Sequence, residues 1–173
     1  DNQRARPSIL VHRVTEPDLS ATRVEAETFE LRYPDGAHDS EALMVDPVAD
    51  ELVLVTKVAD GNSAVYTTPR SAPATPQLVA TVGLGVGQLV TGGDISAGGD
   101  TIVLRTYTSV FVWTRAPGES LGTALLRPPC SAPAPLEAQG EAIALVPAGD
   151  GYVTASEGVG SPIREVRAAP VSP

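Results

Sequence analysis

Short runs of β-branched and apolar residues recur along the chain, and each run is bounded by glycine, proline, aspartate or asparagine. Runs of this length with such boundaries are typical of β-strands. No segment keeps the 3.6-residue apolar period of an amphipathic helix over more than two turns. The pattern therefore predicts an all-β protein, with strands at residues 8–14, 22–33, 41–45, 51–56, 64–68, 77–82, 101–106, 109–114, 121–126, 139–145, 152–156 and 162–167.

One of these strands carries no polar residue after its first position. Residues 41–45 read Glu-Ala-Leu-Met-Val, so the four residues that follow Glu41 are all apolar. A strand with one face in water alternates apolar and polar residues, whereas an unbroken apolar run is typical of a strand that is covered on both faces. We therefore expect residues 41–45 to be buried on both sides.

Three similar units follow one another along the chain, and each opens on an acidic residue. These are Glu41, Asp94 and Glu141, separated by 53 and 47 residues. An apolar strand, a turn of glycine and aspartate and a second strand with a polar end come next in each unit. The polar ends are Lys57, Arg105 and Glu157. A repeat of about 40–50 residues with four strands is typical of a β-propeller blade, whereas a β-sandwich does not restart with the same phrase at this period.

The composition excludes several classes of function. Twelve Lys and Arg residues against 21 Asp and Glu residues give a net charge of −9, whereas nucleic-acid binding depends on basic side chains that neutralise phosphates. No apolar stretch approaches the roughly 20 residues that span a bilayer. Cys130 is the single cysteine, and His12 and His38 are the only histidines. We therefore predict no nucleic-acid partner, no membrane span, no internal disulfide and no cysteine-rich zinc site.

Several phrases of the sequence resemble known propellers. Residues 94–104 (DISAGGDTIVL) look like the inner-strand phrase of TolB-like and WD-repeat propellers. Residues 33–43 (YPDGAHDSEAL), 55–57 (VTK), 91–94 (TGGD), 104–107 (LRTY) and 139–143 (QGEAI) resemble a family of secreted actinobacterial propellers of mostly unassigned function. Esterase-like phytase and SdiA-regulated propellers resemble the chain more distantly. The resemblance implies a secreted β-propeller, and its phrases specify the fold rather than a reaction.

The resemblance also implies that further blades lie outside this chain. We assign residues 1–38 to the outer strands of a partial blade, 39–90 and 91–137 to two blades, and 138–173 to a last blade without its outer strand. Asp1 and Asn2 resemble that family's loop between second and third strands. Since a closed propeller has typically 4–8 blades, we expect the C-terminal half of a six- or seven-bladed ring, from a split or nicked chain. A second polypeptide would then supply the missing blades, and the strand edges near residues 8–14 and 162–167 would be unpaired.

The candidate site follows from this predicted architecture. Inner strands line the central channel of a propeller, so Glu41, Asp94 and Glu141 are expected to converge, with His38, Asp39 and Gln139 nearby. Convergent carboxylates suit a hard cation such as Ca²⁺, although such acids also hydrogen-bond backbone amides of neighbouring blades. Four further residues end second strands near one rim, where they would bind a ligand or form salt bridges between blades. These are Lys57, Arg105, Tyr107 and Glu157.

The segment from His38 to Glu41 contains the residue types of a hydrolase, but adjacent strand residues point to opposite faces and form no relay among themselves. Propellers include both binding proteins and enzymes. We expect a secreted scaffold that binds a protein or glycan partner. The alternative is a Ca²⁺-dependent hydrolase of esters or phosphoesters, with Glu41, Asp94 and Glu141 as metal ligands.

Overall fold

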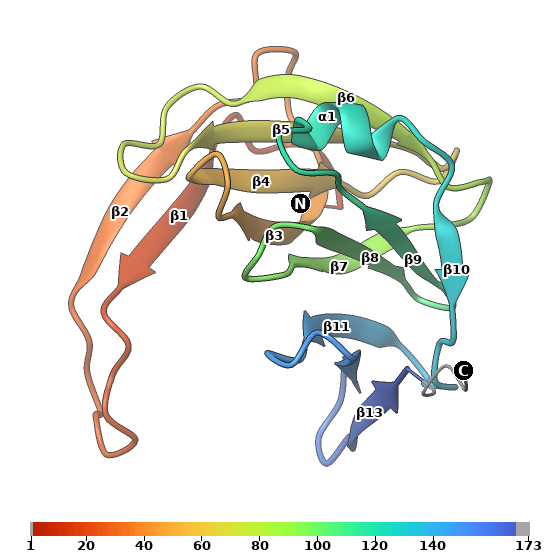
Figure 1. The fold of residues 1–173 in the computed structure, drawn as a ribbon. Coiled ribbons are helices and arrows are strands. Elements are labelled where there is room, and N and C mark those ends of the chain that lie inside the picture. The colour runs from red at the N-terminus through yellow and green to blue at the C-terminus, as the bar shows by residue number, and fades with distance from the viewer. Residues whose placement is uncertain (1, 169–173) are drawn as a thin grey trace.

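The computed structural model describes residues 2–168, and it consists of four antiparallel β-sheets and one short helix (Figure 1). The first sheet pairs β1 (Ile9–Val14) with β2 (Ala26–Leu31). The second has the order β3 (Ser40–Asp46), β4 (Glu51–Thr56), β5 (Asn62–Pro69) and β6 (Gln77–Gly83). The third has the order β7 (Val90–Ile95), β8 (Thr101–Thr106), β9 (Val110–Thr114) and β10 (Cys130–Ala132). The fourth has the order β11 (Gly140–Leu145), β12 (Gly151–Ser156) and β13 (Ile163–Arg167). The predicted all-β class is confirmed.

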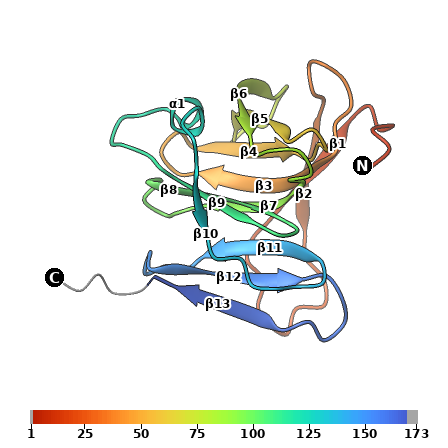
Figure 2. The ribbon, with the colours of Figure 1, turned by 90° about the vertical axis from the view of Figure 1, so that its right-hand side faces the viewer.

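The second, third and fourth sheets follow one another in space as they do in the chain. Their first strands are neighbours, because β3 packs against β7 and β7 packs against β11. Figure 2 shows the resulting layers from the side, and Figure 1 shows the β1–β2 hairpin along one side of the second sheet. Within each of these three sheets, successive strands of the chain are antiparallel neighbours, and each lies farther from the first strand than the one before it.

A register irregularity recurs in these sheets at a constant interval. The pairing of the first strand with the second skips one residue in each sheet, and these residues are Glu41, Thr91 and Glu141. They lie 50 residues apart, and so do the residues that close the second strands, Thr56, Thr106 and Ser156. A bulge re-aims the side chain of the extra residue. The structural repeat therefore has a period of 50 and is regular, whereas the sequence phrases suggested 53 and 47.

The predicted outer strand at residues 121–126 is wrong, because this segment forms the helix α1 (Leu121–Leu125). The Ser120 hydroxyl accepts a hydrogen bond from the backbone N–H of Thr123, which caps the helix. Leu121, Ala124 and Leu125 lie on one helix face and are buried against β6 and β9. The outer strand of the third sheet is β10, which begins at Cys130, whose thiol is free and exposed.

The first strand of the second sheet is also not buried on both faces. Ala42 and Met44 are 3% exposed and face β7, whereas Leu43 is 52% exposed and Val45 is 40% exposed. The apolar run of residues 41–45 thus marks one buried face and one open face.

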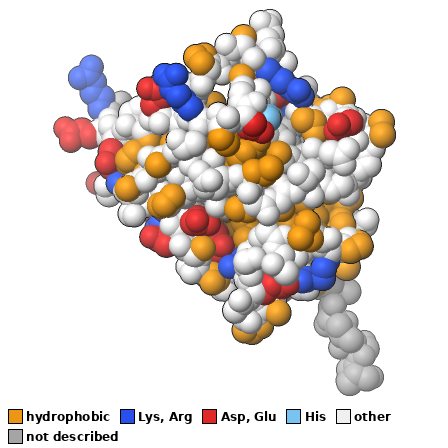
Figure 3. All heavy atoms as spheres, turned by 90° about the horizontal axis from the view of Figure 1, so that it is seen from above, with side chains coloured by type: hydrophobic (Ala, Val, Ile, Leu, Met, Phe, Trp, Pro, Cys, Tyr) orange, Lys and Arg blue, Asp and Glu red, His pale blue; other side chains and the backbone are white. Residues whose placement is uncertain are grey.

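Other exposed apolar residues lie on the side of β6 and α1, where patches of hydrophobic side chains alternate with charged ones (Figure 3). Leu78, Val86 and Leu126 are exposed on β6, in the loop after it and just beyond α1. The helix that the structure contains is far too short and too little apolar to cross a membrane. Asp1, and the residues 169–173 of the predicted last unit, lie outside the described part of the chain.

Candidate functional site

Six of the ten residues singled out in the sequence line one cavity where the second, third and fourth sheets meet. The cavity has a volume of about 450 Å³. We call it the rim pocket, and it is lined by Asn2, Glu41, Lys57, Tyr107, Gln139, Glu141, Ala142, Ala155, Ser156 and Glu157. The structure therefore brings together six predicted side chains that are up to 116 residues apart in the sequence.

The repeated bulge explains why these residues meet. Glu41 and Glu141 are the skipped residues of the first strands in the second and fourth sheets. The residue after each second strand closes the same end of its sheet, since the backbone N–H of Lys57 donates to the Asp39 carbonyl (2.7 Å) and that of Glu157 to the Gln139 carbonyl (2.9 Å). Glu41 and Lys57 in the second sheet thus occupy the positions of Glu141 and Glu157 in the fourth sheet. Both pairs line the rim pocket.

Lys57 connects the second and third sheets across the rim pocket. Its Nζ donates to both Glu41 carboxylate oxygens, at 3.0 Å each, and to the Tyr107 hydroxyl at 2.7 Å. The amine also lies 4.8 Å from the centre of the Tyr107 ring. Burial favours a lower pKa of Lys57, but the hydrogen bonds to Tyr107 and Glu41 and the charges of these groups outweigh burial and raise that pKa. Lys57 is therefore a fixed cation at neutral pH.

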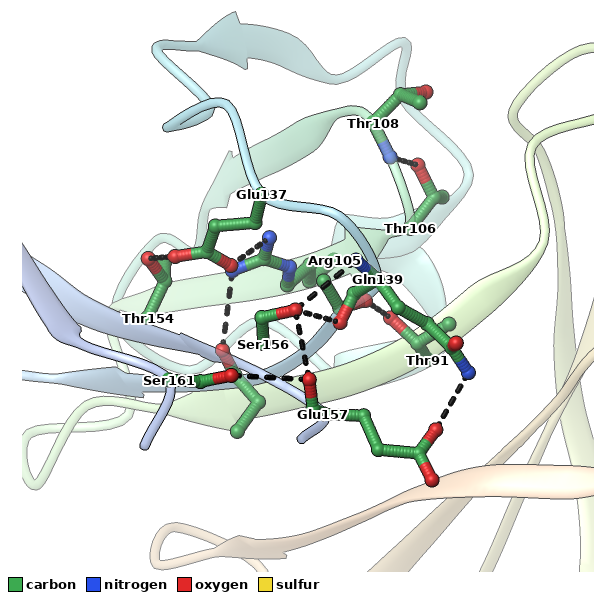
Figure 4. A network of polar contacts seen from close by, with 12 residues as sticks. Thr91, Arg105, Thr106, Thr108, Glu137, Gln139, Thr154, Ser156, Glu157 and Ser161 are labelled. Atoms are coloured by element: carbon green, nitrogen blue, oxygen red, sulfur yellow. Dashed lines mark hydrogen bonds and ion pairs between the residues drawn. The ribbon is translucent and has the colours of Figure 1, made fainter. Parts of the chain in front are cut away.

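Gln139 holds two carboxylates on the opposite side of the pocket. Its Nε2 amide donates to Glu141 Oε1 at 3.0 Å. The same nitrogen donates to Glu157 Oε2 at 2.6 Å, as Figure 4 shows. An amide nitrogen has two N–H donors, so each carboxylate receives one. With three carboxylates against one ammonium, the rim pocket carries a formal charge of about −2 at neutral pH.

Arg105 does not lie at the rim, where it was predicted from the sequence. The position equivalent to Lys57 and Glu157 in the third sheet belongs to Tyr107, which is 50 residues from each. Arg105 instead points between the third and fourth sheets, where its Nη2 donates to Glu137 Oε2 at 2.6 Å (Figure 4). The side chains of this ion pair are 1% and 3% exposed. The salt-bridge alternative is therefore the one that the structure supports for Arg105.

Asp94 does not join Glu41 and Glu141, so the predicted convergence of the three acids is wrong. Its carboxylate accepts hydrogen bonds from the backbone N–H groups of Ile95 and Leu145, both at 2.8 Å. The contact to Leu145 ties the third sheet to the fourth. The bulge of the third sheet has Thr91 in the acidic position. Between residues 2 and 168, no group of three or more His, Cys, Asp or Glu side chains is placed to hold a metal ion.

His38 belongs to a separate polar cluster between the first and second sheets. Its Nε2 lies 3.0 Å from Asp35 Oδ1 and from the Tyr66 hydroxyl, which donates to Asp35 Oδ2 at 2.6 Å. Hydrogen bonds from Tyr66 and His38 lower the pKa of Asp35, while burial and the nearby Asp35 carboxylate raise the pKa of Tyr66. Asp39 is buried, and its backbone carbonyl pairs with Lys57.

Several residues that shape the site are not marked by the sequence phrases. Ser156 lines the rim pocket, and its hydroxyl accepts from the backbone N–H of Gln139 at 3.0 Å (Figure 4). Glu137 lies in a proline-rich connector, where nothing in the local pattern marks it as the partner of a buried arginine. A signal did exist for Ser156, because Thr56, Thr106 and Ser156 are spaced by 50 residues.

Comparisons with known proteins concern the fold. No family model and no curated protein matches the chain. Among solved structures, the chain is similar to Kuenenia stuttgartiensis hydrazine synthase, with a TM-score of 0.52 and 15% sequence identity. The match covers 84% of this chain and 37% of that chain. At this identity the likeness shows a shared fold, and this chain spans little more than a third of its structural neighbour.

Proposed function

We propose that the chain forms three blades and part of another in a secreted β-propeller, and that it is a binding scaffold whose rim pocket holds a ligand. The three antiparallel sheets with neighbouring first strands and a 50-residue period support the blade assignment. The secreted location rests on the resemblance to the actinobacterial propellers.

One observation carries the binding proposal. Three successive sheets contribute side chains from equivalent positions to a single cavity, and these side chains are Glu41, Lys57, Tyr107, Glu141 and Glu157. Side chains that served only to hold one sheet would have no reason to share a pocket with those of two others. Small-molecule sites are concave and hold a few fixed polar groups that orient the ligand, and the rim pocket has such groups beside the Tyr107 ring, Ala142 and Ala155.

The polar groups indicate the class of ligand. The carboxylates and the Gln139 carbonyl accept hydrogen bonds, and the Tyr107 hydroxyl, which accepts from Lys57, keeps its own O–H to donate. Several acceptors and a donor in about 450 Å³ suit a group with several hydroxyls. A pocket with a net negative charge repels anionic ligands. We therefore favour a glycan with neutral or amino sugars over a protein loop.

The hydrolase that the sequence also suggested has less support. Its metal site depended on three convergent carboxylates, and Asp94 is hydrogen-bonded to the fourth sheet instead. Glu41 is in turn bound to Lys57.

Binding to an immobilised panel of neutral, amino, sialylated and sulfated glycans tests the proposal. We expect binding to neutral or amino sugars and none to the anionic sugars. Gln139→Ala should weaken this binding at least tenfold, because it removes the amide that positions Glu141 and Glu157. The matched control is Gln77→Ala, since Gln77 is an exposed residue at the start of β6 outside the rim pocket. Equal binding by the two variants, or binding of anionic sugars alone, would contradict the proposal.

A label at the site makes the test specific. Lys57 is the only lysine of the chain, so reductive methylation with ¹³C-formaldehyde labels this side chain and the N-terminal amine. Dimethylation keeps the positive charge. A glycan that binds in the rim pocket should shift the Lys57 methyl resonance, and Lys57→Arg identifies that resonance by its loss. A bound glycan that leaves the resonance unmoved would place its site elsewhere.

A further inference from the structure

The open face of β3 shows what kind of element should cover it, because the same face is covered in the next two sheets. Leu43 and Val45 point away from β7 and are 52% and 40% exposed. Fifty residues after Val45 stands Ile95, which is 6% exposed, and one hundred residues after Leu43 stands Ile143, which is 8% exposed. Equivalent positions thus differ in burial and not in apolar character.

The covering element in the later sheets is the inner strand pair of the sheet before. Ile95 belongs to a cluster with Met44 of β3 and Val53 of β4. The strand β11, which carries Ile143, packs against β7 and β8, and Val103 of β8 lies in the cluster of Ile143. The contact is close, since a Cβ atom at Gly93 would lie 2.8 Å from the Met44 sulfur. An inner strand pair in this register therefore seals the apolar face of the sheet that follows.

The first sheet offers no such pair to β3. Its two described strands pack farther out, where Ile9 and Val11 contact Leu54 and Tyr66. Between β1 and β3 lie two neighbouring cavities of about 770 Å³ and about 500 Å³. We call this space the β1–β3 groove, and its apolar lining includes Leu10, Val11, Leu43, Val45, Leu52 and Leu54.

The strand edge beside this groove is also open. Among residues 2–168, β1 is paired with β2 along one edge and has no strand on the other. The corresponding third strands β5 and β9 are paired on both edges, with β4 and β8 on the inner side. An unpaired edge beside an apolar face provides main-chain hydrogen bonds together with side-chain pockets, the two elements of β-strand addition.

We propose that the β1–β3 groove binds an antiparallel β-hairpin of a partner polypeptide. The outer strand of the hairpin pairs with β1, and its inner strand lays small or flexible apolar residues on Leu43 and Val45, as Ala42 and Met44 do on β7. The proposal rests on the repeated sheets of the proposed propeller and not on a ligand in the rim pocket.

The chain itself supplies a probe with this chemistry. A fluorescein-labelled peptide of residues 40–56 carries the β3–β4 hairpin with Ala42 and Met44. We expect its fluorescence anisotropy to rise saturably with the full chain at up to about 100 μM. The same peptide with Met44→Lys should bind at least tenfold more weakly. Hydrogen exchange of the β1 amides should slow when the peptide binds.

Variants of the chain locate the binding. Leu43→Lys should weaken binding of the peptide at least tenfold, whereas Leu78→Lys should leave it unchanged. Leu78 is a matched control, because it is 54% exposed on a strand of the same sheet but lies outside the groove. Both variants should fold, since neither leucine is buried. Gln139→Ala, in the rim pocket, should bind the peptide normally, which separates this proposal from the glycan proposal.

Two results would overturn the proposal. One is the absence of saturable binding by the unmodified chain, and the other is equal binding by Leu43→Lys and Leu78→Lys. Sedimentation of the chain alone measures whether it self-associates. Self-association that Leu43→Lys abolishes, together with no peptide binding, would assign the groove to a second copy of the chain.

Discussion

The junction between the second and third sheets differs from the junction between the third and fourth, although the same repeated strands build both. The first buries sixteen apolar residues of the described chain in one cluster, whereas the second buries four. Each junction also contains a buried ion pair, Asp46–Arg115 in the first and Arg105–Glu137 in the second. The Asp46–Arg115 pair thus supplements a large apolar junction, whereas the Arg105–Glu137 pair is a principal contact of a small one.

The difference shows how a repeat tolerates variation between its copies. Arg105 donates to the Ala142 carbonyl as well as to Glu137, and Glu137 accepts from the Thr154 hydroxyl at 2.8 Å. Gly140 leaves the room for this network (Figure 4), since a Cβ atom there would lie 1.8 Å from Arg105 Nη2. A buried charge that loses its partner is strongly destabilising, whereas apolar packing loses stability in proportion to the volume removed. The two junctions should therefore respond differently to mutation.

The largest effect is expected from Glu137→Ala, which leaves the Arg105 guanidinium buried without its carboxylate. Urea denaturation should show a loss of about 3–5 kcal/mol. The double variant Arg105→Met, Glu137→Leu should recover most of this loss, because it makes the junction apolar like its neighbour. A double variant as unstable as Glu137→Ala would show that the hydrogen bonds to Ala142 and Thr154, and not the pairing of charges, hold this junction.

Leu104→Ala tests the apolar junction. Leu104 is fully buried in its cluster, and truncation of a buried leucine costs about 2–5 kcal/mol. We expect a value of about 3 kcal/mol from the same urea measurement. Leu136→Ala is the control, since Leu136 is 96% exposed and its truncation should change the free energy of unfolding by less than about 0.5 kcal/mol.

Gly140→Ala should destabilise the polar junction by about 1–3 kcal/mol, because the added methyl group displaces the Arg105 guanidinium. Thermal unfolding measures the effect. Gly98→Ala serves as the control, since a Cβ atom at Gly98 meets only ordinary contacts, the nearest being Asp100 Oδ1 at 3.5 Å. In the Arg105→Met background the cost of Gly140→Ala should fall. A cost that stays the same would contradict the steric account.

The smallest expected effect concerns pH and the polar cluster of Asp35, His38 and Tyr66. The pKa of Asp35 is lowered by Tyr66 and His38, so its folded-state value lies below the ordinary 3.8. Its contribution to stability is therefore complete above about pH 4 and is lost as the pH falls through the lowered pKa. The stability of Asp35→Asn should fall less steeply than that of the wild type between pH 4 and pH 2, as measured by circular dichroism. Asp18→Asn, in an exposed turn, should keep the wild-type slope.

Much of the fold could be predicted from local pattern. Most of the predicted strand segments coincide with strands of the structure, because alternation and turn residues act within a few positions. Residues 121–126 were assigned to a strand because a single capped turn is too short to show a period. The cap at Ser120 and the close packing of Gly122 on Val79 decide for the helix.

The candidate site could be predicted in part for the same reason. Six of its residues were found because polar residues at strand ends recur with the repeat. Asp94 and Arg105 were misplaced because alignment by local phrase put Asp94 three residues after the bulge position, Thr91, and put Arg105 two residues before the equivalent of Lys57. The register of the bulge at Thr91, which depends on the pairing of two strands, corrects it.

The sequence by itself determined the strands, their turns and the repetition of a two-strand phrase, since each depends on side chains a few residues apart. Only the tertiary structure decided which polar residues meet. The Arg105–Glu137 pair joins residues 32 positions apart, and Lys57 meets Tyr107 across 50. Only the tertiary structure, likewise, shows that Leu43 and Val45 lie open while their equivalents are covered. Burial of a strand face depends on which sheet precedes it, and that is a property of packing rather than of the strand.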